Sequence, residues 1–519
     1  MSASGALTTL TLPTGVTLSS TVRPKFAIFG RYVFVTNSPT RNLWIDPSDD
    51  TVRPMGIQGP ASPCMLAAGS GTGLTGVYKV RVSFIVKDTN GKVIYESPFG
   101  PTSAASASLA NQDLAVTGVP LSADAEINGR RLYRTLAGGN VYFQWIDLDD
   151  NTATAVTDSL SDASLNLLPA PTGLGLAPGS SGGEQLKLLT SWHGRLWGVS
   201  TKASEIDNLR YSEDRLFYAW PATNTLPMPP IGQDSEGITA FAPRRDDLGV
   251  FKRDSLEMVT GFAGSDFQRQ TVKQGIGCIA PESVVIIDDT AYFLAENGVY
   301  RWSAQEVTSI TEAHVHAWMT TTTYFQRASF DLSVGWFDQD LNTYNLLVPA
   351  TGASALTRWI SYDLGEGGWL GPHLTSAFTP NYAATLEDSN DLAMPVICGT
   401  DGFVYKNQST RTDGASTGIA LDVDTIYHSA NTPDIEKLWL ELSLISKIQG
   451  AGTLTITPKV GGLDASAGTA ISADMTKGRE RLRRLGQGRF MQLNFAHSTN
   501  AQDVELYGLE IPYHELGRR

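Results

Sequence analysis

The strongest constraint on the fold is a run of short apolar segments between Gly237 and Trp302, each bounded by turn residues. The turns between them are rich in Asp, Asn and Gly, and Asn-Gly favours the positive φ of a tight hairpin. Short β-prone segments separated by such turns predict a succession of antiparallel hairpins. The expected strands are residues 248–251, 256–259, 284–287, 291–294 and 299–302.

The same unit, in which an apolar strand, a polar turn and a second apolar strand follow one another, recurs elsewhere in the chain. Further copies stand at residues 22–46, 188–220, 333–349, 359–369 and 396–406. Repeated short strands with periodic Gly and aromatic positions are typical of β-propeller blades. We therefore predict a propeller built from residues 1–60, its N-terminal part, and residues 185–410, the remainder.

A separate module is predicted for residues 61–184. Its residues 78–86 alternate between apolar and polar, and Asn90-Gly91 turns the chain into the next strand. Further β-prone segments follow at regular spacing, which predicts an immunoglobulin- or fibronectin-like β-sandwich. The flanking stretches 56–76 and 169–183 are rich in Gly, Pro, Ala and Ser and are expected to be linkers, so the module should be separable.

Residues 411–519 are predicted to form a second β-sandwich, with strands near 435–445, 454–460, 490–495 and 504–513. Within it the sequence KGRERLRRLGQGR places Arg479, Arg481 and Arg483 on one face of any strand, because side chains alternate along a strand. One interpretation is an electrostatic contact with an acidic neighbouring subunit. The other is a solvated edge strand protected by charge. The sequence leaves both open.

Composition supports an all-β protein of more than one domain. The 519 residues are 41% hydrophobic and only 18% charged, and 50 of them are glycine. We expect less than about a tenth of the chain to be helical, well below the usual third, with residues 309–325 as the one plausible helix. The net charge of −14 argues against a surface that grips phosphates. No stretch reads as a signal peptide or a membrane span.

The search for catalytic and metal-binding motifs predicts none. No nucleophile-elbow, phosphate-loop or zinc-protease motif is present. The acidic residues Asp147, Asp149 and Asp150 lack the spacing of a calcium loop and are expected in a solvated turn. The cysteines Cys64, Cys278 and Cys398 are far apart in sequence and are expected to be buried, reduced side chains. We expect no catalytic residue, no cofactor and no bound metal.

Several stretches together resemble a known family. They are VFKRDSLEMVTG at 250–261, KQGIGCIAPESVV at 273–285, YFLAENGVYRWS at 292–303 and GLEIPYHELGRR at 508–519. This arrangement resembles the tail hub or nozzle proteins of tailed bacteriophages, also described as head-completion or stabilisation proteins. The likeness covers roughly residues 20–60 and 185–519, and its motifs concern packing. Residues 60–184 depart from the simplest members.

The resemblance implies a structural virion protein that assembles into a ring, commonly a homohexamer, in the phage tail after synthesis in the host cytoplasm. Such a ring extends the channel of the portal and adaptor, contacts other tail proteins, retains packaged DNA and forms part of its exit path. DNA would pass without sequence-specific binding, and an acidic wall suits such a conduit. Two alternatives stay open: a receptor- or glycan-binding tail spike or fibre module, and a propeller glycoside hydrolase with paired carboxylates.

Overall fold

The computed structural model describes residues 9–20, 22–36, 40–178, 185–231, 237–304, 306–311, 315–353, 355–374, 378–387, 392–406, 412–413, 417–418, 420–449, 452–498 and 504–517. The protein is 4% helix and 50% strand, so the all-β prediction is confirmed. Of the helix expected over residues 309–325, the structure shows the five-residue α1 (His316–Thr320), and Ser309 belongs to a strand. The other helical turns are 3-10: η1 (Ala203–Glu205), η2 (Pro281–Ser283) and η3 (Arg327–Leu332). The chain divides into two compact units, residues 1–335 and 336–519.

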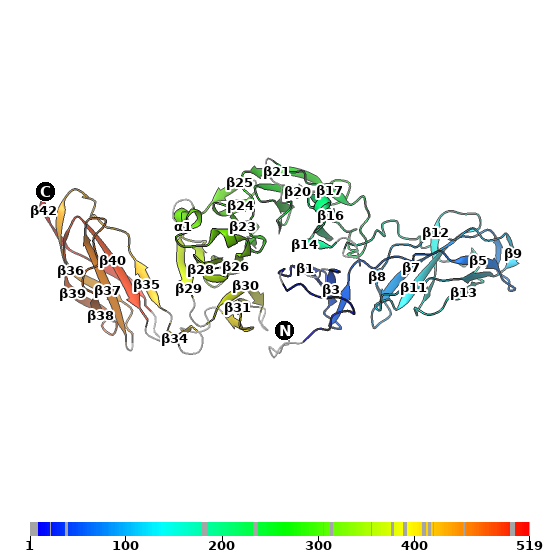
Figure 1. Cartoon of the computed structure of the whole chain (residues 1–519), viewed down its shortest axis with the longest axis horizontal. Coiled ribbons are helices and arrows are strands. Elements are labelled where there is room, and N and C mark those ends of the chain that lie inside the picture. The colour runs from blue at the N-terminus through cyan, green and yellow to red at the C-terminus, as the bar shows by residue number, and fades with distance from the viewer. Residues whose placement is uncertain are drawn as a thin grey trace. The chain divides into compact units, whose positions relative to one another are not determined.

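The described part of the first unit contains four small sheets in which each strand pairs with the next along the chain (Figure 1). The first sheet is β1 (Phe26–Phe29), β2 (Tyr32–Val35), β3 (Leu43–Asp46) and β4 (Thr51–Pro54). The second is β14 (Leu186–Trp192), β15 (Arg195–Ser200), β16 (Asn208–Tyr211) and β17 (Thr225–Pro227). The third is β18 (Ala240–Pro243), β19 (Asp247–Phe251), β20 (Ser255–Thr260) and β21 (Gln268–Gln274). The fourth is β22 (Val285–Ile287), β23 (Thr290–Ala295), β24 (Gly298–Ser303) and β25 (Glu306–Ser309).

Tight turns close these hairpins where the sequence predicts them. Asp288 and Asp289, between β22 and β23, have φ of 46° and 63°. Short polar residues tolerate this left-handed region, and two such residues in succession match the right-handed twist of the flanking strands. His193 and Gly194 do the same between β14 and β15, with φ of 46° and 69°.

The first strands of successive sheets lie next to one another: β1 contacts β14, β14 contacts β18, and β18 contacts β22. Apolar side chains fill the spaces between neighbouring sheets. One cluster joins the second and third sheets through Trp197 and Val250, and another joins the third and fourth through Phe251 and Trp302. Each sheet is therefore held mainly by its neighbours in sequence.

The inserted residues form two packed sheets, with strand orders β13-β10-β5 and β12-β11-β7-β8, and a two-stranded pair, β6-β9 (Figure 1). Their apolar core includes Val80, Val82, Leu114 and Leu132. A double layer of antiparallel strands is the arrangement expected for a β-sandwich. The strands are β5 (Met65–Ala68), β6 (Leu74–Gly76), β7 (Val80–Lys87), β8 (Val93–Glu96), β9 (Leu109–Gln112), β10 (Leu114–Thr117), β11 (Gly129–Thr135), β12 (Tyr142–Leu148) and β13 (Ala155–Asp158).

β8 pairs with only part of β7. Beyond the end of β8, three serines form hydrogen bonds with the backbone of β7 and of Tyr78 just before it. The amide of Ser103 donates to the Val80 carbonyl at 2.8 Å, and the Val80 amide donates to Ser103 Oγ at 2.9 Å. Ser97 makes the same pair of bonds with Phe84, and Ser106 makes it with Tyr78. We call these three residues the serine ladder. It satisfies the backbone of β7 without a regular partner strand.

An aromatic cluster connects the inserted sandwich to the first two sheets. Tyr95 of β8 is fully buried, stacks on Trp44 with ring centres 6.5 Å apart, and lies 5.9 Å from Phe217. The Tyr95 hydroxyl accepts a bond from the Ile57 amide at 3.2 Å. The separability of residues 61–184 stays a prediction. Deleting these residues would remove Tyr95 and expose the Trp44 and Phe217 rings that it contacts.

The second unit begins with two more small sheets, followed by the C-terminal strands. One sheet has the order β26-β27-β28-β29 and the next β30-β31-β32. Their strands are β26 (Val334–Asp338), β27 (Thr343–Pro349), β28 (Leu356–Asp363), β29 (Trp369–Leu374), β30 (Pro380–Glu387), β31 (Ala393–Gly399) and β32 (Val404–Lys406). A small hairpin, β33 (Thr412–Asp413) and β34 (Thr417–Gly418), follows.

The C-terminal strands form two sheets around one apolar core that includes Trp439, Leu442, Ile456 and Phe495. One has the order β35-β40-β37-β38, and in the other β36 lies between β39 and both β41 and β42. Three of the strands expected here are found close to their predicted positions, whereas the expected strand at 504–513 is divided at residues 511–512 into two strands. The strands are β35 (Leu421–Asp424), β36 (Glu436–Ser446), β37 (Thr453–Gly461), β38 (Ile471–Asp474), β39 (Arg479–Gly488), β40 (Phe490–His497), β41 (Leu506–Glu510) and β42 (Tyr513–Gly517).

The expectation of simple linkers on both sides of the insertion was wrong for the described residues. Residues 56–76 contain β5 and β6, and the glycine-rich stretch is held by a bond from the Gly71 amide to Asp113 at 2.8 Å. After the insertion, Ala177 is fully buried in the cluster around Trp44. Small residues are needed here because the chain packs closely. A Cβ on Gly73, for example, would approach the Ser159 carbonyl oxygen to 2.3 Å.

Candidate functional site

The basic stretch is strand β39, at one edge of a C-terminal sheet. Arg479, Arg481 and Arg483 are exposed, whereas Leu482 between them is buried in the core. The two faces of β39 therefore differ at these positions because one packs on the other sheet of the sandwich. Arg484 is exposed as well, and the pairing of β39 with β36 shifts register between Arg481 and Arg484, so the strand does not alternate regularly across the three arginines.

Two of the three arginines have partners among the described residues. Arg479 Nη2 lies 2.9 Å from a Glu510 carboxylate oxygen, and both side chains are more than half exposed. Arg483 Nη2 donates to the Thr469 carbonyl at 2.6 Å. Exposed pairs of this kind contribute little to stability, about 0–1 kcal/mol. Both groups can therefore exchange partners at small cost.

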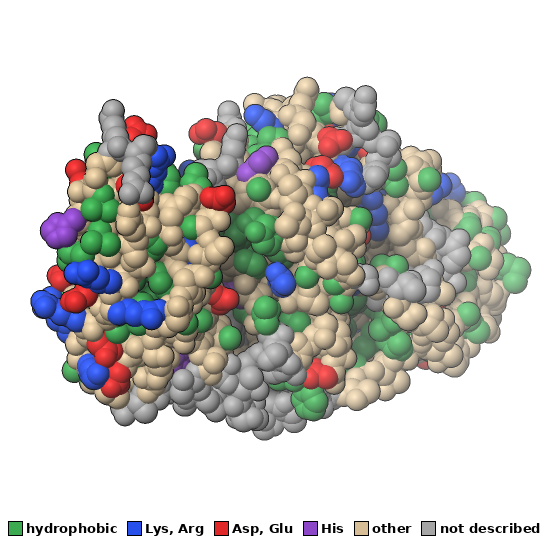
Figure 2. All heavy atoms as spheres, turned by 60° about the vertical axis from the view of Figure 1, so that its left-hand side comes forward, with side chains coloured by type: hydrophobic (Ala, Val, Ile, Leu, Met, Phe, Trp, Pro, Cys, Tyr) green, Lys and Arg blue, Asp and Glu red, His purple; other side chains and the backbone are tan. Residues whose placement is uncertain are grey.

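Acidic side chains accompany the basic ones on this part of the protein. Lys477 pairs with Glu480 at 2.7 Å, and Lys447 pairs with Glu505 at 2.8 Å. On the face shown in Figure 2, Lys and Arg side chains lie beside Asp and Glu side chains and do not form one continuous basic patch. Such a mixed surface suits contact with another mixed surface better than contact with a uniform polyanion.

The acidic residues of this run in the inserted sandwich form ion pairs with neighbouring basic residues. Asp150 pairs with the buried Arg130 at 2.8 Å, and Asp147 binds Arg131 through two bonds of 2.7 and 2.9 Å. Backbone amide hydrogen bonds, foremost from Ala153, lower the pKa of Asp150 to about 2. Within the described ranges, no cluster of three His, Cys, Asp or Glu residues could hold a metal ion.

A buried polar network lies within the sheet β12-β11-β7-β8 of the inserted sandwich. Glu96, 3% exposed, accepts hydrogen bonds from Ser83 Oγ at 2.6 Å and from the Tyr133 hydroxyl at 2.7 Å, and it pairs with Arg131 at 3.2 Å. Burial raises the pKa of the Tyr133 phenol, and the adjacent Glu96 charge raises it further. Glu96, Ser83, Tyr133 and Arg131 therefore satisfy one another's polar groups within this sheet.

Two contacts connect the beginning of the first sheet to the region around the fourth. Lys25, directly before β1, forms an ion pair with Glu282 in η2, and both side chains are largely buried. Arg23 Nη1 donates to the Leu332 carbonyl at 2.8 Å. Sequence reasoning missed these contacts, because a lone Lys and a lone Glu 257 positions apart carry no local pattern.

The cysteines are free thiols: Cys64 and Cys278 are buried, and Cys398 is half-buried. Burial raises the pKa of Cys64 to about 11 and that of Cys278 to about 12. Such thiols are poor nucleophiles and poor metal ligands at neutral pH, because the reactive thiolate is scarce.

Comparisons with known proteins leave the family open. No protein-family model matches the chain. No curated protein matches it either. Among solved structures, a computationally designed protein, Ika8, is 10% identical with a TM-score of 0.28, covering 73% of this chain and 94% of its own. An exo-beta-1,3-galactanase from Phanerochaete chrysosporium is 11% identical with a TM-score of 0.21, covering 83% of this chain and 100% of its own. Among the described residues, no helix has the length and apolar character needed to cross a bilayer.

Proposed function

We propose that the protein is a structural component of a tailed-phage virion, a hub or nozzle subunit. Copies assemble into a ring, a homohexamer, that extends the portal and adaptor channel, retains packaged DNA and forms part of its exit path. The sequence resemblance motivates this proposal. The structural observation that supports it is the group of exposed arginines on β39 in a chain with a net charge of −14.

Ring assembly of an acidic chain requires local charge matching, because copies with the same net charge repel one another. Arg479, Arg481 and Arg483 offer cations on an ordered strand, and a guanidinium binds a carboxylate through two parallel hydrogen bonds. The overall acidity also suits a DNA conduit, since each cation bound to a phosphate would slow passage.

The proposed architecture for residues 1–60 and 185–410 is a β-propeller. The contacts between the first strands β1, β14, β18 and β22 support it, because blades place their first strands around a common axis. The Lys25–Glu282 pair supports it as well, since it connects the first and fourth sheets. The sheets β26–β29 and β30–β32 would be further blades.

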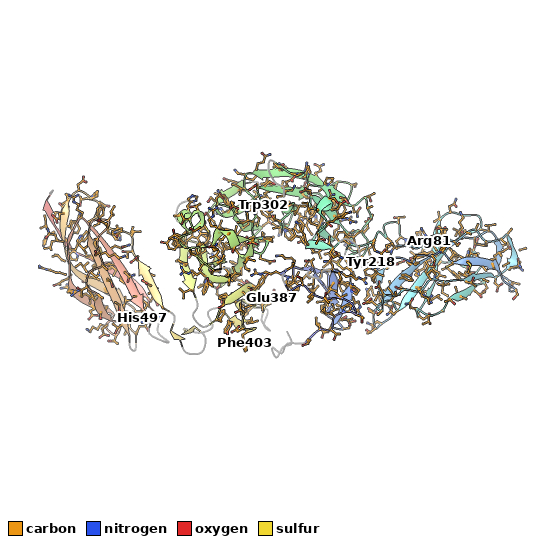
Figure 3. All side chains as sticks on the ribbon, viewed as in Figure 1. Arg81, Tyr218, Trp302, Glu387, Phe403 and His497 are labelled. Atoms are coloured by element: carbon orange, nitrogen blue, oxygen red, sulfur yellow. The ribbon has the colours of Figure 1, made fainter. Side chains whose placement is uncertain are left out.

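A second candidate function is binding of a receptor glycan. It is favoured by aromatic side chains in the second unit, where the half-buried Phe378 and Tyr405 stack with ring centres 3.8 Å apart. Phe403, labelled in Figure 3, is 66% exposed nearby in sequence. Sugars stack on exposed rings of this kind. A propeller glycoside hydrolase is the weaker alternative, because the sequence offers no assignable acid and nucleophile pair.

One experiment separates these functions. The purified protein should be imaged by electron microscopy and sedimented at several concentrations, and the same sample should be applied to a glycan array. The proposal expects closed rings with a through-channel and no selective glycan binding. A monomer at every concentration that binds one glycan class would replace it with the second function.

A further inference from the structure

The sheet that contains β39 has two edges of opposite charge. Strand β36 lies in its centre, with β39 on one side and with β41 and β42, one after the other, on the other side. Among the described residues, β39, β41 and β42 each pair with β36 and with no further strand. Both edges are therefore open to pairing with another molecule.

Strand β39 forms the basic edge. It contains four arginines, all exposed, and one glutamate, Glu480, which pairs with Lys477 at 2.7 Å. Arg479 and Arg483 make the contacts within the chain that are described above, and Arg481 and Arg484 are the two further cations of this edge.

Strands β41 and β42 form the acidic edge. Residues 504–517 contain no Lys or Arg, and their three exposed carboxylates are those of Glu505, Glu510 and Glu515. The next two residues, Arg518 and Arg519, lie outside the described residues. The same two strands expose apolar side chains, with Tyr507 64% and Leu516 50% exposed. An edge that exposes Tyr and Leu beside its charges gains apolar burial when another strand covers it.

The two edges also match in direction and in height along the strands. β39, β41 and β42 are all antiparallel to β36, so both edges run the same way. Arg481 and Glu510 both lie opposite Ser443, and residues that face one another in a ladder project from the same face of the sheet. A rotation about an axis along the strands involves no shift along them. It therefore places Arg481 of one copy at the height of Glu510 of the next.

We propose that β41 and β42 of one copy bind β39 of the next copy, which extends the sheet with a parallel strand and forms the head-to-tail contact of the ring. A surface and its complement at opposite edges of one sheet make a heterologous interface, and such an interface closes into a ring when the rotation permits it. The opposite charges select a second copy of this chain as the occupant, because each copy carries both halves of the contact. This inference rests on the ring function proposed above and names the surface that the β39 arginines meet.

Charge reversal at each edge tests the contact. The basic-edge variant carries Arg481→Glu and Arg484→Glu, and the acidic-edge variant carries Glu510→Lys and Glu515→Lys. In sedimentation, each variant alone should need a concentration higher by about tenfold or more to assemble. An equimolar mixture of the two should assemble like the unchanged protein, because each reversed edge then meets its complement on the other variant.

The matched control carries Arg215→Glu and Arg301→Glu, which change the net charge as much as the basic-edge variant does. Both arginines are exposed in the first unit, and the Arg215 side chain is 89% exposed. The control should assemble like the unchanged protein. An equal loss in the control would show that net charge, and not the β39 edge, decides assembly, and would overturn the proposal.

A disulfide between copies gives a second measurement that needs no charge reversal, and it keeps the test decisive if a reversed variant does not fold. Full-length chains with Arg481→Cys are mixed with chains that carry Glu510→Cys, and the mixture is oxidised. The mixture should give a covalent pair of the two chains, and neither variant alone should cross-link through its new thiol.

The outcomes separate this contact from the ring function. Rings that persist unchanged in both charge-reversed variants, a mixture that does not recover assembly, or a cysteine mixture without the mixed disulfide would each overturn the contact and leave the ring function standing. Absence of rings from the unchanged protein at every concentration would overturn both.

Discussion

The guanidinium of Arg244 lies over the indole of Trp302, 3.6 Å from the ring centre, and connects the third and fourth sheets. Arg244 also binds Asp247 through two bonds of 2.7 and 2.8 Å and donates to the Ala304 carbonyl at 3.0 Å. Trp302 is fully buried. Arg244, which follows directly after the first strand of the third sheet, therefore contacts both the Trp302 ring of the fourth sheet and the backbone at Ala304.

Replacing Arg244 by Met should destabilise the first unit by about 3–5 kcal/mol. The change leaves the Asp247 carboxylate without its buried partner, which is the costly way to break such a pair. Thermal unfolding followed by tryptophan fluorescence measures the effect. The exposed Arg215→Met serves as the control and should leave the transition in place; equal shifts for the two variants would contradict the expectation.

Gly249→Ala should destabilise the same contact by overpacking. A Cβ at Gly249 would come within 2.4 Å of the Trp302 ring. Fully packed interiors lose about 1–3 kcal/mol to such an insertion. Gly368→Ala is the matched control, because a Cβ there would meet no atom within 4 Å. A melting temperature that Gly249→Ala leaves unchanged would show that the ring has room to move.

Ser103→Ala should weaken the serine ladder locally. It removes the side-chain acceptor of the buried Val80 amide, and an unsatisfied buried donor costs about 1–3 kcal/mol. Hydrogen exchange read by mass spectrometry should show faster exchange at β7, whereas Ser164→Ala, at an exposed serine pair, should not. Unchanged protection of β7 would mean that another group satisfies this amide.

The three changes Arg479→Ala, Arg481→Ala and Arg483→Ala together should reduce assembly of the protein. Desolvated charge pairs across an interface cost about 2–5 kcal/mol when one partner is removed, whereas rim pairs cost little and fade with salt. Sedimentation at low and high salt, with Arg215→Ala as the control, measures this. An unchanged assembly state would show that the arginines only protect a solvated edge.

Stability should fall at alkaline pH. Burial raises the pKa of Cys278 to about 12 from its ordinary value of 9.0, and burial likewise raises the pKa of Tyr95. Between about pH 9 and 12 the unfolded state has lost protons that the folded state retains, so stability decreases as the pH rises through this window. Denaturant unfolding from pH 7 to 11 tests this, with Cys278→Ala expected to flatten the slope.

The strands of the first unit that the sequence predicts are those with an apolar face. Segments 248–251, 256–259 and 299–302 lie within β19, β20 and β24, whose side chains are largely buried. The outer strand β21 escaped prediction because its sequence, QRQTVKQ, is polar and mostly exposed. An edge strand can form because its neighbour offers free backbone hydrogen-bonding groups. This pairing does not require apolar side chains, so the sequence of the edge strand does not reveal it.

Contacts between distant residues set the other limit on prediction. The sequence predicts a strand at the β39 arginines, but the register shift between Arg481 and Arg484 interrupts the alternation on which the predicted single face depends. The π-flanked Arg81 was missed, since Phe99 and Tyr142 approach it only through the pairing order of four strands. Glycine- and alanine-rich stretches resemble linkers in sequence, although small residues pack closely as readily as they allow the chain to bend.

The serine ladder affects whether many copies of this protein can lie close together without aggregating. An open strand edge recruits edges from other molecules, and proteins usually block this with charges, bulges or Pro. Here Ser97, Ser103 and Ser106 use both backbone and hydroxyl groups to occupy the edge of β7 from within the chain. Many copies could then lie side by side at high local concentration without β7 joining them into aggregates.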